Sequence, residues 1–184
     1  TDTVVLLGML TFDGPANLQQ ACVTVRSSLQ IGGDDLDDDA HIIFVNCHNQ
    51  GHKSFGGGLY VGEDLTMVSG SLEIEHSSSF KGGGGLYIRK GNLHQDGGII
   101  KLQYVYSNRS GGGLLIERGG LFQAKGEISC EQCRAERGGC LALNGTESPG
   151  LHSNGSIRAE SCVVQSGPNV YECNNHAVFL RPLL

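Results

Sequence analysis

The sequence repeats itself every 27 or 28 residues, and this period constrains the fold more than any other feature of the chain. Each copy begins with a glycine-rich triplet, which is followed by three residues that alternate apolar, variable and apolar. The anchor leucines of the four clear copies are Leu59, Leu86, Leu114 and Leu141, at spacings of 27, 28 and 27 residues. An imperfect earlier copy occupies residues 22–25. A repeat of this length is typical of solenoid proteins, in which each repeat packs mainly against its neighbours.

Each repeat contains two further short segments with the pattern of β-strands. The second segments are 29–31, 65–67, 93–95, 121–123 and 151–153. The third segments alternate, with apolar pairs at Ile42/Phe44, Leu72/Ile74, Leu102/Tyr104, Ile128/Cys130 and Ile157/Ala159. Alternation with a period of two residues predicts strands, and no stretch shows a sustained helical period.

Three short strands per repeat and about five repeats predict an all-β fold, a single-stranded parallel β-helix in which each repeat forms one coil. Coils stack at ~4.8 Å, the spacing of paired strands, so equivalent apolar residues form columns inside the solenoid. The glycine triplets then lie at a corner, where stacked neighbours leave little room for a Cβ atom. A β-sandwich with glycine-rich hairpins is the alternative, and the constant spacing argues against it.

The pattern Gly-Gly-x-[Leu/Ile], together with the element Phe44-Val-Asn-Cys47, resembles the repeat of polymorphic outer membrane proteins. That repeat occurs in bacterial autotransporter passenger domains and in large repeat proteins of some algae and protists. The resemblance covers roughly residues 20–170. It implies a right-handed parallel β-helix used for surface display, adhesion or structural work, and it brings no catalytic residues.

The domain organisation follows from the limits of the repeat. We expect residues 1–20 to form an N-terminal cap or first strand, and residues 21–170 to form the β-helix. Residues 171–184 form a C-terminal cap or a docking tail, in which Phe179 and Leu180 are candidate partner-binding residues. Because the chain starts Thr1-Asp2-Thr3, we expect a processed product or a piece of a longer protein.

An acidic insertion at 34–39 lengthens the first repeat. Its carboxylates are Asp34, Asp35, Asp37, Asp38 and Asp39. Such density is a weak candidate for a Ca²⁺ site, but the spacing of an EF-hand loop is missing. A solvated acidic loop is the preferred interpretation, and no cofactor is expected.

Residues that face outward on the first strands include a stripe of Tyr60, Tyr87 and Leu115 on adjacent coils, with Phe122 nearby. Contiguous outward aromatic and aliphatic side chains predict a surface that binds a partner protein. The alternative is that a loop of the same chain covers them.

The seven cysteines include two that the repeat places at equivalent corners of neighbouring coils, Cys133 and Cys162. A separation of one coil, ~4.8 Å, lies within the Cα range of a disulfide, so these two are the disulfide candidates, bridged or free. A zinc or redox site at Cys130, Cys133 and Cys140 is the alternative, and no further ligands complete it.

The charge and the sequons bear on the environment of the protein. A net charge of −6 argues against binding to nucleic acid, which needs a basic face. No apolar run reaches the ~18 residues of a membrane span, so membrane association is expected only through partners. The sequons at Asn108, Asn144 and Asn154 favour an extracytoplasmic location: secreted, at the cell surface or in an organelle lumen.

These features predict a protein without catalytic activity that binds other proteins within a larger extracytoplasmic assembly. The outward carboxylates, on Glu73, Glu75, Glu131 and Glu160, are interrupted by Gln103 and Val105, so they lack the clustering that glycoside cleavage requires. A surface adhesion or glycan-binding module is the first alternative. A degenerate carbohydrate-active enzyme is the second.

Overall fold

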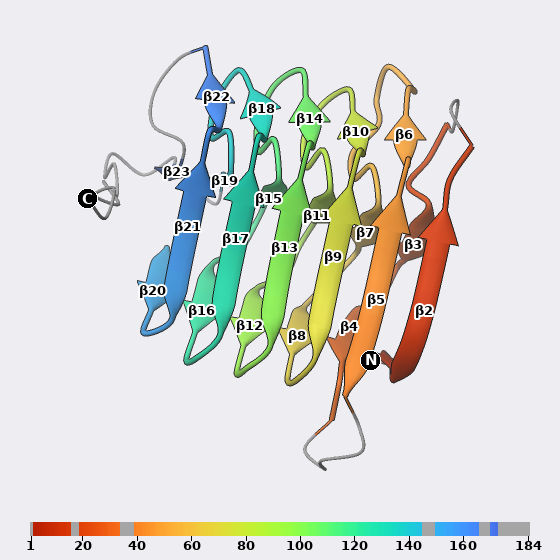
Figure 1. The fold of residues 1–184 in the computed structure, drawn as a ribbon, viewed down its shortest axis with the longest axis vertical. Helices are drawn as coiled ribbons and strands as arrows, with labels where there is room; N and C mark the ends of the chain where they lie inside the picture. Colours follow the sequence, from red (N-terminus) through yellow and green to blue (C-terminus); the bar gives the residue numbers. More distant parts are fainter. Residues whose placement is uncertain (1, 16–18, 34–38, 145–149, 166–169, 173–184) are drawn as a thin grey trace.

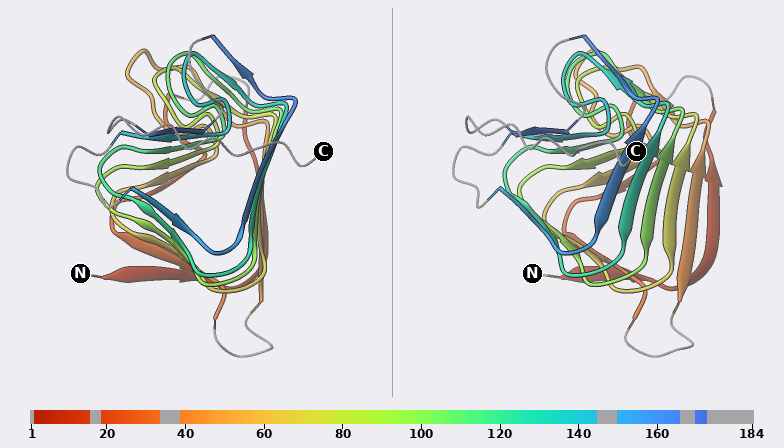
Figure 2. Two further views of the ribbon diagram at one scale, coloured as in Figure 1. Left: turned by 90° about the vertical axis from the view of Figure 1, so that its left-hand side faces the viewer. Right: turned by 60° about the vertical axis from the view of Figure 1, so that its left-hand side comes forward.

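The computed structural model describes residues 2–15, 19–33, 39–144, 150–165 and, for the backbone alone, 170–172. The described chain is all-β, and its strands pair in parallel in a solenoid of about five coils. Figure 1 shows the coils side by side, and Figure 2 shows a roughly triangular cross-section that winds in the right-handed sense. No helix long and apolar enough to cross a membrane occurs among these residues.

Four sheets run along the solenoid, and each coil contributes one strand to each sheet. The first sheet consists of β3 (Val23–Val25), β7 (Leu59–Val61), β11 (Leu86–Ile88), β15 (Leu114–Ile116), β19 (Leu141–Leu143) and β23 (Val170–Glu172). The second consists of β1 (Thr3–Leu6), β4 (Ser28–Ile31), β8 (Leu65–Met67), β12 (Leu93–Gln95), β16 (Leu121–Gln123) and β20 (Leu151–Ser153).

The third sheet has the longest strands and forms the flat wall that faces the viewer in Figure 1. It consists of β2 (Gly8–Asp13), β5 (Ala40–Val45), β9 (Ser71–Glu75), β13 (Ile99–Gln103), β17 (Glu127–Glu131) and β21 (Ser156–Glu160). The fourth consists of the two-residue strands β6 (His48–Asn49), β10 (Ser78–Ser79), β14 (Tyr106–Ser107), β18 (Arg134–Ala135) and β22 (Val163–Val164).

The predicted parallel β-helix is confirmed, and its register is the one that the anchor leucines define. Leu86 pairs with Leu59 on one side and with Leu114 on the other, and Leu114 pairs with Leu141. All four leucines are fully buried, so they form one of the internal columns. The fourth strand of each coil differs from the prediction of three, because two residues are too short to show an alternating pattern.

The register also corrects one coil of the third sheet. Ile100 pairs with Leu72 and Leu102 with Ile74, so the buried pair is Ile100/Leu102 and not Leu102/Tyr104. Tyr104 lies at the following corner with a φ of 54° and is exposed. The corners of all five coils have a residue with positive φ at this point: Asn46, His76, Tyr104, Gln132 and Ser161. The backbone must turn sharply there towards the fourth sheet, so it selects the left-handed conformation even without glycine.

Two buried glutamines satisfy polar backbone groups inside the solenoid. The Nε2 of Gln123 donates to the Oε1 of Gln95 at 3.0 Å, and also to the carbonyl oxygens of Gly126 and Ser156. The Nε2 of Gln95 donates to the carbonyl oxygens of Gly98 and Glu127. A buried amide that meets its partners stabilises a fold rather than weakening it, so this pair secures the corner after the second sheet.

The strands of the fourth sheet and the segments that follow them fold back onto the outside of the first sheet. We call this projection the lobe, and it consists of residues 48–56, 78–83, 106–111 and 134–138. Beyond the strands of the fourth sheet, successive coils of the lobe are connected by single bridges, Phe55 to Gly82, Gly82 to Ser110 and Ser110 to Arg137. Figure 2 shows the lobe projecting beyond the triangular section.

The lobe corrects the prediction of an exposed stripe on the first sheet. Tyr87 and Leu115 are 1 % exposed and pack with Ala142 in a second small core, against which Phe55 and Tyr60 also pack. The alternation was read correctly, because these side chains do face away from the main core. They are covered by a segment of the same chain and are not a free contact surface.

The ends of the chain extend the stack. β1 and β2 pair with β4 and β5 as an incomplete coil, and the side chains exposed there include Val4, Val5, Leu7 and Met9. Residues 173–184, with Phe179 and Leu180, lie outside the described residues. So do Asp34, Asp35, Asp37 and Asp38 of the acidic insertion, whereas Asp39 is described and exposed.

Candidate binding groove

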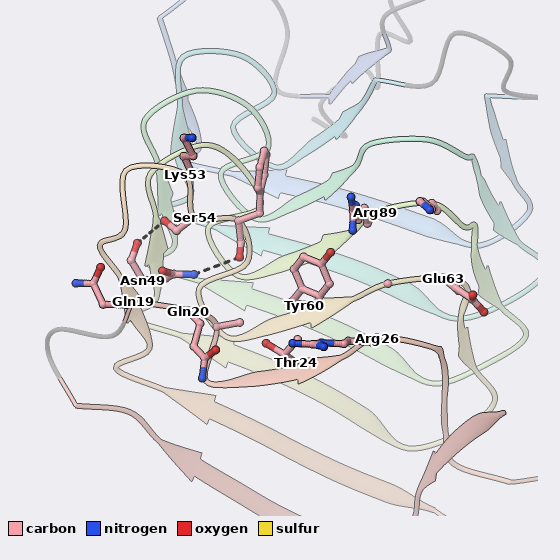
Figure 3. A pocket seen from close by; sticks show the side chains of 14 residues that line it. Gln19, Gln20, Thr24, Arg26, Asn49, Lys53, Ser54, Tyr60, Glu63 and Arg89 are labelled. Atoms are coloured by element: carbon pink, nitrogen blue, oxygen red, sulfur yellow. Dashed lines mark hydrogen bonds between the residues drawn. The ribbon is translucent and has the colours of Figure 1, made fainter. Parts of the chain in front are cut away.

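A groove of about 530 Å³ lies on the outside of the first sheet, where the lobe begins. One wall consists of residues 19–21 and of the lobe segment from Asn49 to Phe55. The other consists of Thr24 on β3, Tyr60 on β7 and the residues that follow β3, β7 and β11 (Figure 3). Thr24 on β3 is exposed and Tyr60 on β7 is half-buried, so the lobe leaves this part of the sheet open.

Aromatic rings form the floor of the groove. The ring of Phe55 stacks on Tyr87 with centroids 4.5 Å apart, and the ring of Tyr60 meets the same Tyr87 at 5.2 Å. The ammonium of Lys81 lies 5.7 Å from the ring centroid of Phe55, within the range of a cation–π contact. Only Phe55 and Tyr60 of these rings line the groove, while Tyr87 supports them from below.

A buried hydrogen bond fixes the supporting ring. The hydroxyl of Tyr87 donates to the carboxylate of Glu117. Burial raises the pKa of Tyr87 far above its usual value, and the hydrogen bond to Glu117 and its negative charge raise this pKa further. The phenol therefore stays neutral at any physiological pH and holds the floor in one position.

The walls of the groove are cationic although the chain as a whole is acidic. Four exposed cations line it, Arg26, Lys53, Arg89 and Lys90, and the one carboxylate among its lining residues is that of Glu63. None of the four cations forms an ion pair with another residue that the structure describes. Four cations against one carboxylate, in a protein of net charge −6, give this groove a locally positive potential.

A glycine separates the two arginines. The backbone amides of Gly62 and Arg89 donate to the carbonyl oxygens of Val25 and Val61, which places Arg26, Gly62 and Arg89 at the same corner of three successive coils. A Cβ atom on Gly62 would lie 2.2 Å from the carbonyl oxygen of Arg26. Two coil spacings, ~10 Å, therefore separate the backbones of Arg26 and Arg89, and the corner residue between them, Gly62, has no side chain.

One buried polar atom in the wall of the groove has no hydrogen-bond partner. Asn49 is 2 % exposed, and its Nδ2 donates to the carbonyl oxygens of Phe55 and Gly56. Within the described residues, its Oδ1 accepts no hydrogen bond. A buried acceptor without a donor is unfavourable by ~1–3 kcal/mol.

The fourth residue predicted for the contact surface lies elsewhere, on the outside of the second sheet. Phe122 stacks between His94 and His152, with ring centroids 5.2 and 5.5 Å apart. The three rings occupy one position on neighbouring strands. Phe122 is half-buried by these rings, so it does not join Tyr60 in a common surface.

The cysteines pair differently from the prediction. Disulfides join Cys22 to Cys47 and Cys130 to Cys140, whereas the predicted candidates, Cys133 and Cys162, are free thiols. Corner stacking does bring the latter two together, because their neighbours Arg134 and Val163 are paired. The first bridge connects the segment beside the groove to the corner of the first full coil.

The thiol pair predicts selective alkylation. The hydrogen bond from Cys133 lowers the pKa of Cys162, and the same bond together with burial raises the pKa of Cys133. Cys162 is half-buried and Cys133 buried, so iodoacetamide should modify Cys162 before Cys133, as measured by peptide mass mapping. Because a lowered pKa maintains the thiolate at lower pH, the rate of this alkylation should stay high below pH ~8.5, the usual thiol value. A Cys133→Ala variant should shift the pH profile upward, and an unchanged profile would contradict the pairing.

Two of the three sequon asparagines are accessible. Asn108 and Asn154 are exposed, and Asn144 is half-buried. Asn108 lies in the lobe, where its Oδ1 accepts a hydrogen bond from the hydroxyl of Tyr106. Neither Asn108 nor Asn154 lines the groove, so glycans at these positions would leave it open.

Gln103 interrupts the row of outward carboxylates on the third sheet, in which only Glu131 and Glu160 are direct neighbours. Glu75 and Glu131 both pair with Gln103, whose Nε2 donates to Glu131 at 2.6 Å. Glu73 forms an ion pair with Lys101 at 3.8 Å. In the part of the chain that the structure describes, no group of three or more His, Cys, Asp or Glu residues could hold a metal ion.

Comparison of the chain with models of protein families, with curated proteins and with solved structures gives no match. The groove therefore has to be interpreted from its own residues. Apart from Tyr60, the sequence-based prediction missed them. A signal was present, because Arg26, Gly62 and Arg89 each come directly after a first strand, but only the lobe shows that these residues line a hollow.

Proposed function

We propose that this protein is a non-catalytic docking module, in which the β-solenoid is a rigid frame and the cationic groove binds a partner outside the cytoplasm. The observation that carries the proposal is the groove itself, which combines aromatic side chains, polar side chains and four cations that form no ion pair within the described residues. Concave sites that bring apolar surface together with a few polar groups are the usual form of a binding site. Polymorphic outer membrane protein repeats, which this chain resembles, imply the same role in display or adhesion.

The frame supports this proposal because the floor of the groove belongs to the solenoid. β7 pairs with β3 and with β11, and the inward side chains of β7, Leu59 and Val61, are fully buried. A site built on paired strands keeps its geometry without a ligand, which reduces the loss of entropy on binding.

The native mass tests this proposal. After mild extraction we expect the chain to elute with a bound protein or glycan, and light scattering followed by mass spectrometry of the same fraction measures this. A bare monomer of 19.5 kDa, with neither protein nor glycan attached, would contradict the docking role. Extraction in high salt is the control, because it should release a partner that is held by the exposed cations.

A further inference from the structure

We infer that the ligand of the groove is an acidic sugar, a carbohydrate unit that carries a carboxylate or a sulfate. This inference rests on the proposed function and specifies the chemical class of its ligand. Three independent features of the groove lead to it, and each specifies a different part of the ligand.

The cations specify the negative group. Arg26 and Arg89 face the opening from corners two coils apart, and Figure 3 shows the ring of Tyr60 between them. A guanidinium offers a planar pair of donors that fits a carboxylate or a sulfate in a bidentate way. Lys53 on the lobe and Lys90 beyond Arg89 add positive charge at both sides. A neutral sugar would leave these cations without partners.

The half-buried ring of Tyr60 specifies an apolar face. Sugar rings present C–H groups on one side, and these groups pack on aromatic rings. Gly62, at the corner that follows β7, has no side chain and cannot carry one, since an added Cβ would lie 2.2 Å from the backbone oxygen of Arg26. A simple anion such as phosphate offers no such face.

The polar side chains of the wall specify a ligand with hydroxyl groups. The hydroxyl groups of a sugar are donors as well as acceptors. Ser54 and Thr24 also line the groove, together with the amides of Gln19 and Gln20. The hydroxyl of Ser54 already donates to the carbonyl oxygen of Asn49 at 2.8 Å, which holds this wall in place. Amide and hydroxyl side chains of this kind suit a polyhydroxylated ligand better than the carboxylate side chains of a peptide.

Calorimetric titration of the full chain tests the inference with four probes. They are a trimer of galacturonic acid, a galactose trimer that carries sulfate groups, the neutral galactose trimer, and a hexamer of glutamate. We expect one or both acidic sugars to bind at least about tenfold more tightly than the neutral trimer. The preference between carboxylate and sulfate identifies the acidic group. Equal binding of the neutral trimer, or binding of the glutamate peptide alone, would overturn the inference.

Variants assign the binding to this groove. Arg26→Gln and Arg89→Gln should each weaken binding of the acidic trimer roughly tenfold, because each removes one charge-assisted contact. Lys125→Gln is the matched control, since Lys125 is exposed and lies outside the lining of the groove. The affinity of this variant for the acidic trimer should stay within about twofold of that of the unchanged protein. Thermal unfolding of each variant confirms that the frame is intact. If Lys125→Gln weakens binding as much as the arginine variants do, the loss of a positive charge accounts for the effect, and the groove is not the binding site.

One further measurement separates this inference from the proposed function. The mass of the acidic trimer is recorded before and after a long incubation with the protein. Cleavage would overturn the non-catalytic role and leave the ligand class standing. Failure of all the sugars to bind, together with a co-eluting protein partner in the native mass measurement, would overturn the ligand class and leave the docking role standing.

Discussion

Replacement of Gly84 with alanine should lower the free energy of unfolding by at least about 3 kcal/mol. An added Cβ would lie 2.3 Å from the carbonyl oxygen of Tyr106 and 2.4 Å from that of Gly112. Both atoms belong to the backbone, so no side-chain rotation relieves the contact. The neighbouring coils must separate, and the amide of Gly84 then loses its hydrogen bond to Gly111 at 3.1 Å.

A thermal melt followed by circular dichroism measures this effect, with an expected decrease of roughly 6–12 °C in Tm for a chain of this size. Gly8→Ala is the matched control, because Gly8 has a φ of 73° and no heavy atom within 4 Å of the added Cβ. In this control, the strained backbone conformation should lower the free energy of unfolding by ~1–2 kcal/mol, with no added contribution from a steric clash. If Gly84→Ala is as stable as Gly8→Ala, this result would contradict the claim that the glycine corners of neighbouring coils leave no room for a Cβ atom.

The glycine corners show what the sequence can predict. The triplets recur at a fixed spacing, and one coil stacked on another must leave no space for a Cβ. Gly57, Gly84 and Gly112 satisfy this expectation, since each added Cβ would meet a backbone oxygen of the next coil within 2.1–2.4 Å. The columns of buried leucines follow from the same repeat.

The burial of Tyr87 shows what alternation alone leaves open. Alternation predicts that Tyr87 faces away from Leu86, which is correct. It does not specify whether another segment covers that face, because the covering residue, Phe55, comes from the lobe segment between β6 and β7, two coils earlier. The lobe has only two-residue strands and isolated bridges, so it carries no periodic signal. The lobe both covers the stripe that was predicted to be exposed and forms one wall of the groove.

The cysteine pairing shows a second limit. Equivalent corners place Cys133 beside Cys162, and the repeat predicts this proximity correctly. Cys22 lies just before β3, and Cys47 lies at the corner after β5. These are different positions of the repeat, and their meeting depends on how the chain enters the first full coil. Register arguments therefore identify cysteines that stack, and they miss a bridge between unlike positions.

Removal of the bridge between Cys22 and Cys47 should produce the second large effect. The double variant Cys22→Ala/Cys47→Ala opens a loop with a sequence separation of 25. In the chain-entropy model, this loss lowers the free energy of unfolding by about 3 kcal/mol. Urea denaturation measures it as a lower midpoint. The double variant Cys133→Ala/Cys162→Ala is the matched control, because it replaces two free thiols and breaks no cross-link. The free energy of unfolding of this control variant should decrease by only about 1 kcal/mol.

The same bridge affects the groove, because Cys22 comes directly after the three groove residues Gln19, Gln20 and Ala21. In the disulfide variant this wall remains connected to the frame through hydrogen bonds such as that from the amide of Cys22 to the carbonyl oxygen of Gly57, at 3.0 Å. We expect the affinity for the acidic trimer to decrease several-fold in this variant and to stay unchanged in the Cys133→Ala/Cys162→Ala control. Because both double variants remove two sulfur atoms, a difference between them isolates the covalent link. Equal urea midpoints would show that the bridge does not stabilise the first full coil, and equal affinities would show that it does not position the wall of the groove.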